Sequence, residues 1–485
     1  MRTSLNCQIA VIGIGCLVFS TLLTPAAADA PDLPQPPNVL LLVADDLGYA
    51  ELGCQGNEAV KTPRLDAFSQ TAVRCTQAYV TAPNCSPSRA GFLTGRIPLR
   101  FGYEFNPIGA RNEDPQTGLP SKQQTMAEYL HDAGYTTGLV GKWHLGGAAD
   151  FHPQRHGFDE FFGFLHEGHY FVPSPWNETT TWIRRKGLPP GHGDRYEVSE
   201  NLVYSSHMGH DEPDYDANNP ILREGQPVVE TAYFTDAITR EATSFIKRYR
   251  TSPWFLYVAY NAVHSPLQAK NETLVHFSDE RDIHRRIFLA MLYDLDQSVG
   301  QILEALEDTG QSQNTLVVFF SDNGGPTKET TASNLPLRDG KGSMYEGGIR
   351  VPFLIRWPGK LEGGSLSESI ISTLDLFPTL QDTIGVKSQY PLDGIPITKA
   401  IESPESASGR TLYWRQGKRA ALRQGRWKIV APNGYDDASK WQIFDLEADP
   451  GEAKDLSESQ PYEQQMKDLL REWNALNQQM AEPLF

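Results

Sequence analysis

Two clusters of oxygen-bearing side chains in this sequence could hold a metal ion. Each cluster follows an apolar run. Together they offer three carboxylates and one amide: Asp45, Asp46, Asp322 and Asn323. Oxygen-only ligands suit a hard cation such as Ca²⁺ or Mg²⁺ rather than zinc. Bunched carboxylates without a cation would repel one another. A single Asp-Asp pair would be explained as a helix cap, but two acidic clusters after separate apolar runs predict a metal site.

A second group of side chains carries positive charge or an imidazole ring. Its members are Arg89, Lys142, His144, His264 and Lys341. Lys142 and His144 are two residues apart, so on an extended segment they would point to the same side. The chain has a net charge of −17, which makes it a poor binder of nucleic acid. An anionic substrate would therefore need a local cationic pocket, which these five residues could form.

Four apolar runs must position these side chains, namely 39–43, 137–140, 254–258 and 316–320. Continuous apolar runs of this length are typical of strands buried on both faces of a parallel sheet. Helical patterns at Thr125–Ala133 and Ile287–Leu306 alternate with them, which predicts an α/β fold. In open α/β sheets the site lies beyond the carboxyl ends of the strands. We therefore expect the polar clusters to meet in one crevice.

The sequence changes character after about residue 385. Short strand-like pieces at 411–415, 419–422, 427–430 and 441–446 precede a polar helix, Pro461–Gln478. The segment Glu167–Gln226 is expected to be one long irregular insertion that shapes access to the site.

One eleven-residue run carries the most specific signal. Cys85-Ser86-Pro87-Ser88-Arg89, followed by Leu93-Thr94-Gly95, resembles the signature of the type I sulfatases, in the alkaline phosphatase superfamily. The run Gly340–Pro352 is similar to a second signature of that family, and Phe444-Asp445-Leu446 looks like its C-terminal segment. The resemblance extends from Asn38 to about Leu456.

The resemblance implies a fold and a set of roles. The fold would be a large mixed, mostly parallel sheet flanked by helices in a catalytic domain at 31–385. A small antiparallel sheet with one helix would follow at 386–485. A maturation enzyme would oxidise Cys85 to formylglycine (3-oxoalanine), whose hydrate completes the shell of a Ca²⁺ ion, with Mg²⁺ as the alternative. The remaining metal ligands would be Asp45, Asp46, Asp322 and Asn323.

The same resemblance assigns the cationic residues to catalysis. Arg89 and Lys142 would hold the hydrate, and His144 would be its base. Lys142, His264 and Lys341 would bind the sulfate, and the last two would assist the leaving alcohol. One hydroxyl of the hydrate would attack sulfur, and deprotonation of the other would expel sulfate.

The favoured function is hydrolysis of a sulfate ester, of a sulfated carbohydrate or another small sulfate ester. Two alternatives stay open: a phosphonate monoester or phosphodiester hydrolase of the same superfamily, and a non-catalytic relative that binds sulfated glycans. Nitrogen ligands at the strand ends are too few for a two-zinc site.

The first thirty residues are typical of a signal peptide. Arg2 is followed by the apolar segment Ile9–Leu23 and by small residues at 26–30, which predicts an exported chain without membrane insertion after cleavage. Cys7 and Cys16 would be removed with the signal peptide. Cys54 and Cys75 could pair in an oxidising compartment, although two buried free thiols are favoured.

Overall fold

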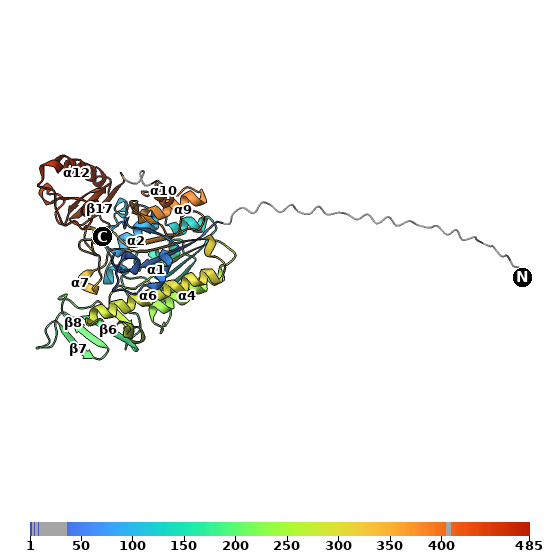
Figure 1. The fold of residues 1–485 in the computed structure, drawn as a ribbon. Helices are drawn as coiled ribbons and strands as arrows, with labels where there is room; N and C mark the ends of the chain where they lie inside the picture. Colours follow the sequence, from blue (N-terminus) through green and yellow to red (C-terminus); the bar gives the residue numbers. More distant parts are fainter. Residues whose placement is uncertain (2–3, 5–7, 9–35, 404–408) are drawn as a thin grey trace. The chain divides into compact units, whose positions relative to one another are not determined.

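Parallel strands form the centre of a large sheet in the fold drawn in Figure 1. The computed structural model describes residues 36–403 and 409–485, together with positions 1, 4 and 8. The predicted signal peptide lies almost wholly outside the described residues and stays a prediction. Residues Pro36–Phe485 form one compact unit.

The large sheet has ten strands within the described residues. In spatial order they are β10 (Gln226–Pro227), β9 (Leu222–Arg223), β5 (Glu160–Phe164), β4 (Thr136–Lys142), β11 (Trp254–Ala259), β1 (Asn38–Ala44), β13 (Thr315–Ser321), β14 (Phe353–Arg356), β2 (Val73–Cys75) and β15 (Leu366–Ser367). The five strands from β5 to β13 run parallel, and β14 and β9 join their two sides antiparallel. The predicted mixed, mostly parallel sheet is confirmed.

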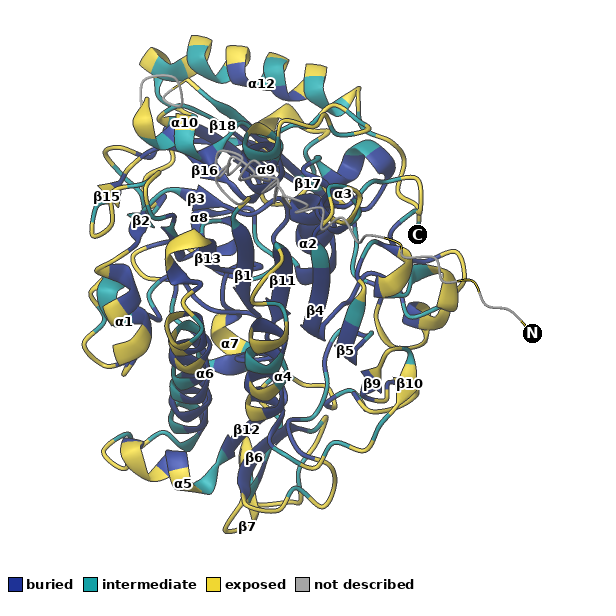
Figure 2. Ribbon diagram, turned by 90° about the vertical axis from the view of Figure 1, so that its right-hand side faces the viewer, coloured by how far each residue is buried: buried dark blue, intermediate teal, exposed yellow. Residues whose placement is uncertain are grey.

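All four apolar runs are neighbouring strands of this sheet. β1 lies between β11 and β13, and β4 is next to β11. Their register pairs Val43 with Ala259 on one side and with Phe320 on the other, so the carboxyl ends of the strands lie at one edge. Figure 2 shows these central strands as buried.

Helices cover both faces of the sheet. The helices are α1 (Pro63–Ser69), α2 (Cys85–Thr94), α3 (Met126–Asp132), α4 (Phe234–Arg248), α5 (Asn271–Leu274), α6 (Ile283–Asp308), α7 (Thr327–Thr330), α8 (Glu346–Ile349), α9 (Leu376–Ile384), α10 (Ile397–Glu402) and α12 (Glu463–Asn477). The helices predicted at 125–133 and 287–306 correspond to α3 and α6.

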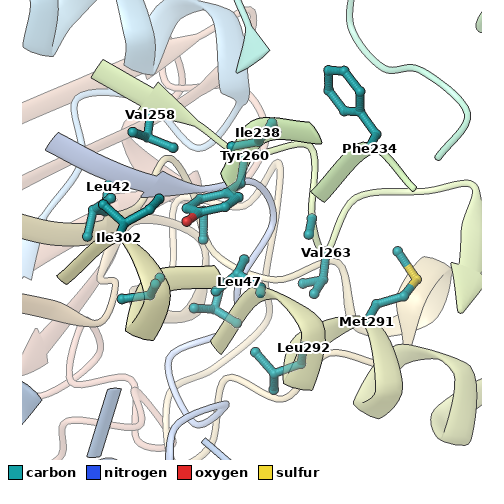
Figure 3. Packing of buried hydrophobic residues seen from close by; sticks show 14 of the residues in the cluster. Leu42, Leu47, Phe234, Ile238, Val258, Tyr260, Val263, Met291, Leu292 and Ile302 are labelled. Atoms are coloured by element: carbon teal, nitrogen blue, oxygen red, sulfur yellow. The ribbon is translucent and has the colours of Figure 1, made fainter. Parts of the chain in front are cut away.

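Alternate residues of β1 enter two different cores, because side chains alternate across a strand. Leu40 and Leu42 pack with α4 and α6, whereas Val39 and Leu41 pack with α2, α3 and α9. Figure 3 shows Leu42 in the first core, together with labelled side chains of α4 and α6.

The expectation of an irregular insertion at 167–226 is wrong in part. This segment contains β6 (Thr179–Arg184), β7 (Arg195–Ser199) and β8 (Leu202–Ser205), which form a four-stranded sheet with β12 (Leu267–Lys270). β6 is buried because it pairs with β12 and contacts α6. These partners are distant in the sequence, so the local pattern gave no signal for the pairing.

The C-terminal part of the chain forms a second, antiparallel sheet. Its strands are β17 (Thr411–Gln416), β18 (Arg419–Gln424), β19 (Trp427–Ala431) and β20 (Gln442–Asp445). Leu469 and Trp473 of α12 are buried against it, which confirms the predicted sheet with one helix. A further pair, β3 (Ala78–Tyr79) and β16 (Ile371–Ser372), is parallel. In the described part of the chain, no helix is both long and apolar enough to cross a bilayer.

Candidate active site

The polar clusters meet at the carboxyl edge of the central strands, as predicted. Asp45 and Asp46 follow β1, and Asp322 and Asn323 follow β13. All four side chains are buried. The Asn323 Nδ2 donates to Asp46 Oδ1 at 2.7 Å, and the Asp46 backbone N–H donates to Asp322 Oδ1 at 3.3 Å. The two acidic clusters are therefore in direct contact.

Each of the three carboxylates has its own cationic partner. Lys142 Nζ donates to Asp45 Oδ2 at 2.6 Å, and Lys341 Nζ donates to Asp46 Oδ2 at 2.8 Å. Arg89 donates from Nε and Nη2 to Asp322 Oδ2, at 3.0 and 2.8 Å. The predicted cationic residues and the predicted metal ligands thus form one charge-balanced cluster.

Burial and neighbouring charges set the carboxyl pKa values. Burial acts to raise the pKa of Asp46, but Lys341 and His264 outweigh it and lower the value to about 2. Burial and the adjacent Asp45 raise the pKa of Asp322 to about 6. Crowding of carboxylates is thus felt at Asp322 even with Arg89 beside it.

Cys85 is the first residue of α2 and is almost fully buried. Its sulfur lies in a group of ligand atoms from Asp45, Asp46, Cys85 and His264 that are all within 4.8 Å of one another. Burial raises the pKa of the Cys85 thiol to about 12. Because the thiolate is the reactive form of cysteine, the unmodified side chain is a poor nucleophile at neutral pH.

His144 is a neutral imidazole with one nitrogen available. Its Nε2 lies 2.9 Å from the Pro107 carbonyl oxygen, which can only accept, so Nε2 carries the hydrogen. The buried Nδ1 has no hydrogen-bond partner among the described residues. Burial and Lys142 place the pKa of His144 well below its usual range, so the imidazole is neutral and Nδ1 keeps its lone pair.

The extended segment expected through Lys142 and His144 is not present, because β4 ends at Lys142. His144 has φ 56°, in the left-handed region, so the alternation of a strand does not apply there. Asp46 has φ 63°. Asp and His are among the residue types enriched in this conformation.

His264 is buried beside Asp46. Its Nδ1 lies 2.5 Å from the Ser265 carbonyl oxygen, and its Nε2 is 3.6 Å from Asp46 Oδ2. Burial and Lys341 lower the pKa of His264 to about 4.

A polar network behind His264 escaped the sequence analysis. Glu329 of α7 accepts from Ser265 Oγ at 2.7 Å and pairs with Arg184 of β6 at 2.6 Å. Arg184 also pairs with Glu212 at 2.5 Å. Arg184 and Glu212 belong to the insertion and Glu329 to a short helix, so no strand-end pattern marked these three residues.

The donor set fits a hard divalent cation. Asp45 Oδ1 and Asn323 Oδ1 are buried without hydrogen-bond partners in the described part of the chain. Such oxygens call for a ligand, because buried polar atoms are ordinarily satisfied. The group within 4.8 Å contains His264, whereas Asp322 and Asn323 contact it through Asp46.

A cavity of about 460 Å³ opens beside Lys341. Its lining comes from the loop around α7, from residues 339–345, from Met208 of the insertion, and from Arg419 and Pro432 of the C-terminal part. Residues far apart in the sequence thus surround one space next to the charged cluster.

Comparisons with known proteins agree with this arrangement. The family model "Sulfatase" matches residues 37–386, and the model "N-sulphoglucosamine sulphohydrolase, C-terminal" matches residues 339–479. N-acetylgalactosamine-6-sulfatase of Canis lupus familiaris is 34% identical, over 87% of this chain and 76% of that protein. Steryl-sulfatase of Mus musculus is 32% identical, over 87% and 73%.

A solved structure shares the fold. The crystal structure of Ps i-CgsB has a TM-score of 0.80 and 34% identity, covering 93% of this chain and 94% of that one. The chain therefore belongs to the sulfatase family, and it is a sulfuric ester hydrolase.

Cys54 and Cys75 are not paired with each other. Both are free thiols, Cys75 buried and Cys54 partly buried, which is the arrangement favoured from the sequence.

Proposed function

We propose that this enzyme removes sulfate from a sulfated carbohydrate, with a formylglycine made from Cys85 as its nucleophile. The observation that carries the proposal is the position of Cys85, buried within the cluster of Asp45, Asp46 and His264. A thiol whose pKa is about 12 has little nucleophilic use there. Oxidation of the side chain to the aldehyde, followed by addition of water, would give a hydrate whose hydroxyl is the oxygen nucleophile that this position needs.

Asp45, Asp46, Asp322 and Asn323 would hold the divalent cation, Ca²⁺ or Mg²⁺, which would polarise oxygens bound to it. Each of these residues offers a buried oxygen at one edge of the sheet. Arg89 fixes the Asp322 carboxylate through two N–H donors, so we assign to it a positioning role as well as a share of the positive charge.

The cationic side chains would bind the sulfate group. Burial acts to lower the pKa of Lys341, but Asp46 and other anions raise it well above its usual range, so Lys341 stays charged. Lys142 and His264 lie against the same carboxylates. Loss of one donor fixed toward developing negative charge costs about 3–4 kcal/mol in comparable sites.

His144 would be the base. Its Nδ1 is buried, unprotonated and without a partner among the described residues, while Nε2–H is held by Pro107. His264 and Lys341 both lie against Asp46 Oδ2, and they could assist the leaving alcohol.

A carbohydrate substrate is supported by two relatives and by the cavity. One relative is named an N-acetylgalactosamine-6-sulfatase, and the structure of Ps i-CgsB was also solved in complex with k-i-k-neocarrahexaose. The cavity is lined by charged and polar residues such as Lys328, Glu329 and Ser343, which suits a hydroxyl-rich ligand better than an apolar one. The predicted signal peptide would export the enzyme, as a periplasmic or secreted protein or into another secretory compartment.

Two measurements test the proposal. Peptide mass spectrometry of active enzyme, with and without an aldehyde-reactive hydrazide, should find an aldehyde at residue 85. Intact cysteine in fully active enzyme would contradict the nucleophile assignment. Rates on sulfated sugars, 4-nitrophenyl sulfate and an aryl phosphonate should rank sulfate esters first. A higher kcat/KM on the phosphonate would favour the alternative reaction.

A further inference from the structure

Arg419, the first residue of β18, brings a positive charge from the C-terminal sheet into the cavity beside Lys341. Its Nη1 donates to the Gly342 carbonyl oxygen, and its Nη2 donates to Gln416 Oε1 at 2.8 Å. Both acceptors are neutral. They fix the guanidinium in place without balancing its charge.

Among the buried and partly buried guanidinium groups, Arg89 pairs with Asp322 and Arg410 pairs with Asp375 at 2.5 Å. The buried Arg423 also donates to neutral oxygens only, but it does not line the cavity beside Lys341. Arg419 forms no ion pair in the described ranges 36–403 and 409–485, and burial alone lowers its pKa. A partly buried cation without a counter-charge costs free energy, so the site is suited to an anion supplied by a ligand.

The other charges of the cavity do not supply that anion. Lys341 is balanced by Asp46, and Glu329 is paired with Arg184. Asp339 is exposed and accepts from Ser343 Oγ at 3.1 Å. The guanidinium of Arg419 is therefore left to act on whatever enters the cavity.

The position of Arg419 relates it to the reaction centre. A Cβ atom built on Gly342 would lie 3.6 Å from Arg419 Nη1 and 3.7 Å from Asn84 Oδ1. Gly342 follows Lys341, and Asn84 precedes Cys85. Arg419 Nη1 and Asn84 Oδ1 thus flank Gly342, and Gly342 and Asn84 are the sequence neighbours of Lys341 and Cys85. Because residue 342 is a glycine, the space between Arg419 and Asn84 stays open.

We propose that Arg419 binds a second anionic group of the substrate, so that the enzyme selects glycans with a sulfate or a carboxylate near the ester sulfate that it hydrolyses. The inference rests on the proposed function and extends it. Guanidinium matches both groups, because its planar fork can donate two parallel hydrogen bonds to either.

The test compares matched disaccharides. One carries a single sulfate ester, the second carries an additional sulfate, and the third carries a uronic carboxylate in place of that sulfate. For each enzyme variant, the selectivity is kcat/KM with the second anion divided by kcat/KM without it. We expect the wild type to favour at least one doubly anionic substrate. Arg419→Gln should lower that selectivity about 10- to 100-fold, the range for a lost hydrogen bond to a charged group.

Two further variants separate recognition from other effects. Arg419→Lys keeps the charge but loses the planar fork, so its selectivity should lie between that of the wild type and that of Arg419→Gln. Lys418→Gln removes a neighbouring exposed charge that does not line the cavity, and it should change the selectivity less than twofold.

Several outcomes would overturn the inference. They are an unselective wild type, an equal selectivity in Arg419→Gln, or an equal loss in Lys418→Gln. Activity of the wild type on 4-nitrophenyl sulfate in those cases would leave the proposed function standing. A wild type that hydrolyses no sulfate ester would instead refute the proposed function, and this inference with it.

Discussion

Replacement of Arg89 by methionine should destabilise the protein strongly, because it removes the cation from a fully buried pair. Arg89 donates twice to Asp322 Oδ2 and once each to the Lys142 carbonyl oxygen and Tyr257 Oη. Both partners of the pair have no exposed side-chain surface. Loss of one partner of a buried ion pair costs about 3–5 kcal/mol, since it leaves the other charge uncompensated.

The same reasoning predicts a rescue. If the cost comes from the stranded Asp322 carboxylate, then Arg89→Met combined with Asp322→Asn should recover about 2 kcal/mol or more of the loss. Activity should not recover, because the double variant lacks a proposed metal ligand and a proposed cation. The second substitution would then raise stability without restoring activity.

Urea unfolding in the presence of a chelator measures these differences without a contribution from bound metal. Arg471→Met is the control, since the Arg471 side chain is 75% exposed and surface substitutions usually stay within about 0.5 kcal/mol. A loss below about 1 kcal/mol for Arg89→Met would refute the reasoning. So would a double variant no more stable than the single one.

The remaining predictions concern the metal, the nucleophile and pH. Chelation should abolish activity, calcium or magnesium should restore it better than zinc, and Asp322→Ala should resemble the chelated enzyme; full activity after chelation would contradict the ligand assignment. Cys85→Ser, made in a host that oxidises only cysteine, should release one equivalent of alcohol from an aryl sulfate and then stop as a sulfated serine. Intact-protein mass would show this adduct, whereas steady turnover would contradict the need for formylglycine. Burial raises the pKa of Glu452 from 4.5 to about 7. Between these pH values the native state holds a proton that the unfolded chain has released, so the free energy of unfolding falls as the pH rises from about 4.5 to 7. Glu452→Gln should flatten the dependence of Tm on pH between about 4.5 and 7, the exposed Glu458→Gln should not, and identical profiles for all three proteins would refute the assignment.

The sequence indicated where these polar side chains would meet because its signals are local. Each central strand is a continuous apolar run, and a buried parallel strand needs that composition wherever it lies. The polar residues Asp45, Lys142, His264 and Asp322 come directly after such runs or a few residues later. Parallel strands bring their carboxyl ends to one edge, so the topology alone was enough to gather them.

The pairings within the site could not be read in the same way. Arg89 and Asp322 are 233 positions apart, and nothing local indicates which carboxylate each cation would contact. The Arg184–Glu329 pair depends on β6 joining β12, which the irregular composition of the insertion concealed. Arg419 reaches the cavity only because β18 packs beside the loop of Gly342. Side-chain partners separated by such distances depend on tertiary packing, which periodicity does not report.

The left-handed backbone at Asp46 and His144 has a consequence for how the site can change. For a residue without a short polar or ring side chain, this conformation costs about 1–2 kcal/mol of free energy, and for a β-branched residue the cost is higher. Asp46→Glu would therefore change more than the length of a side chain, because it would also shift the local backbone preference. Asparagine or glycine would be tolerated by the backbone at either position but would lack the chemistry. The range of substitutions open to these two positions is thus limited twice, by the main chain and by the reaction.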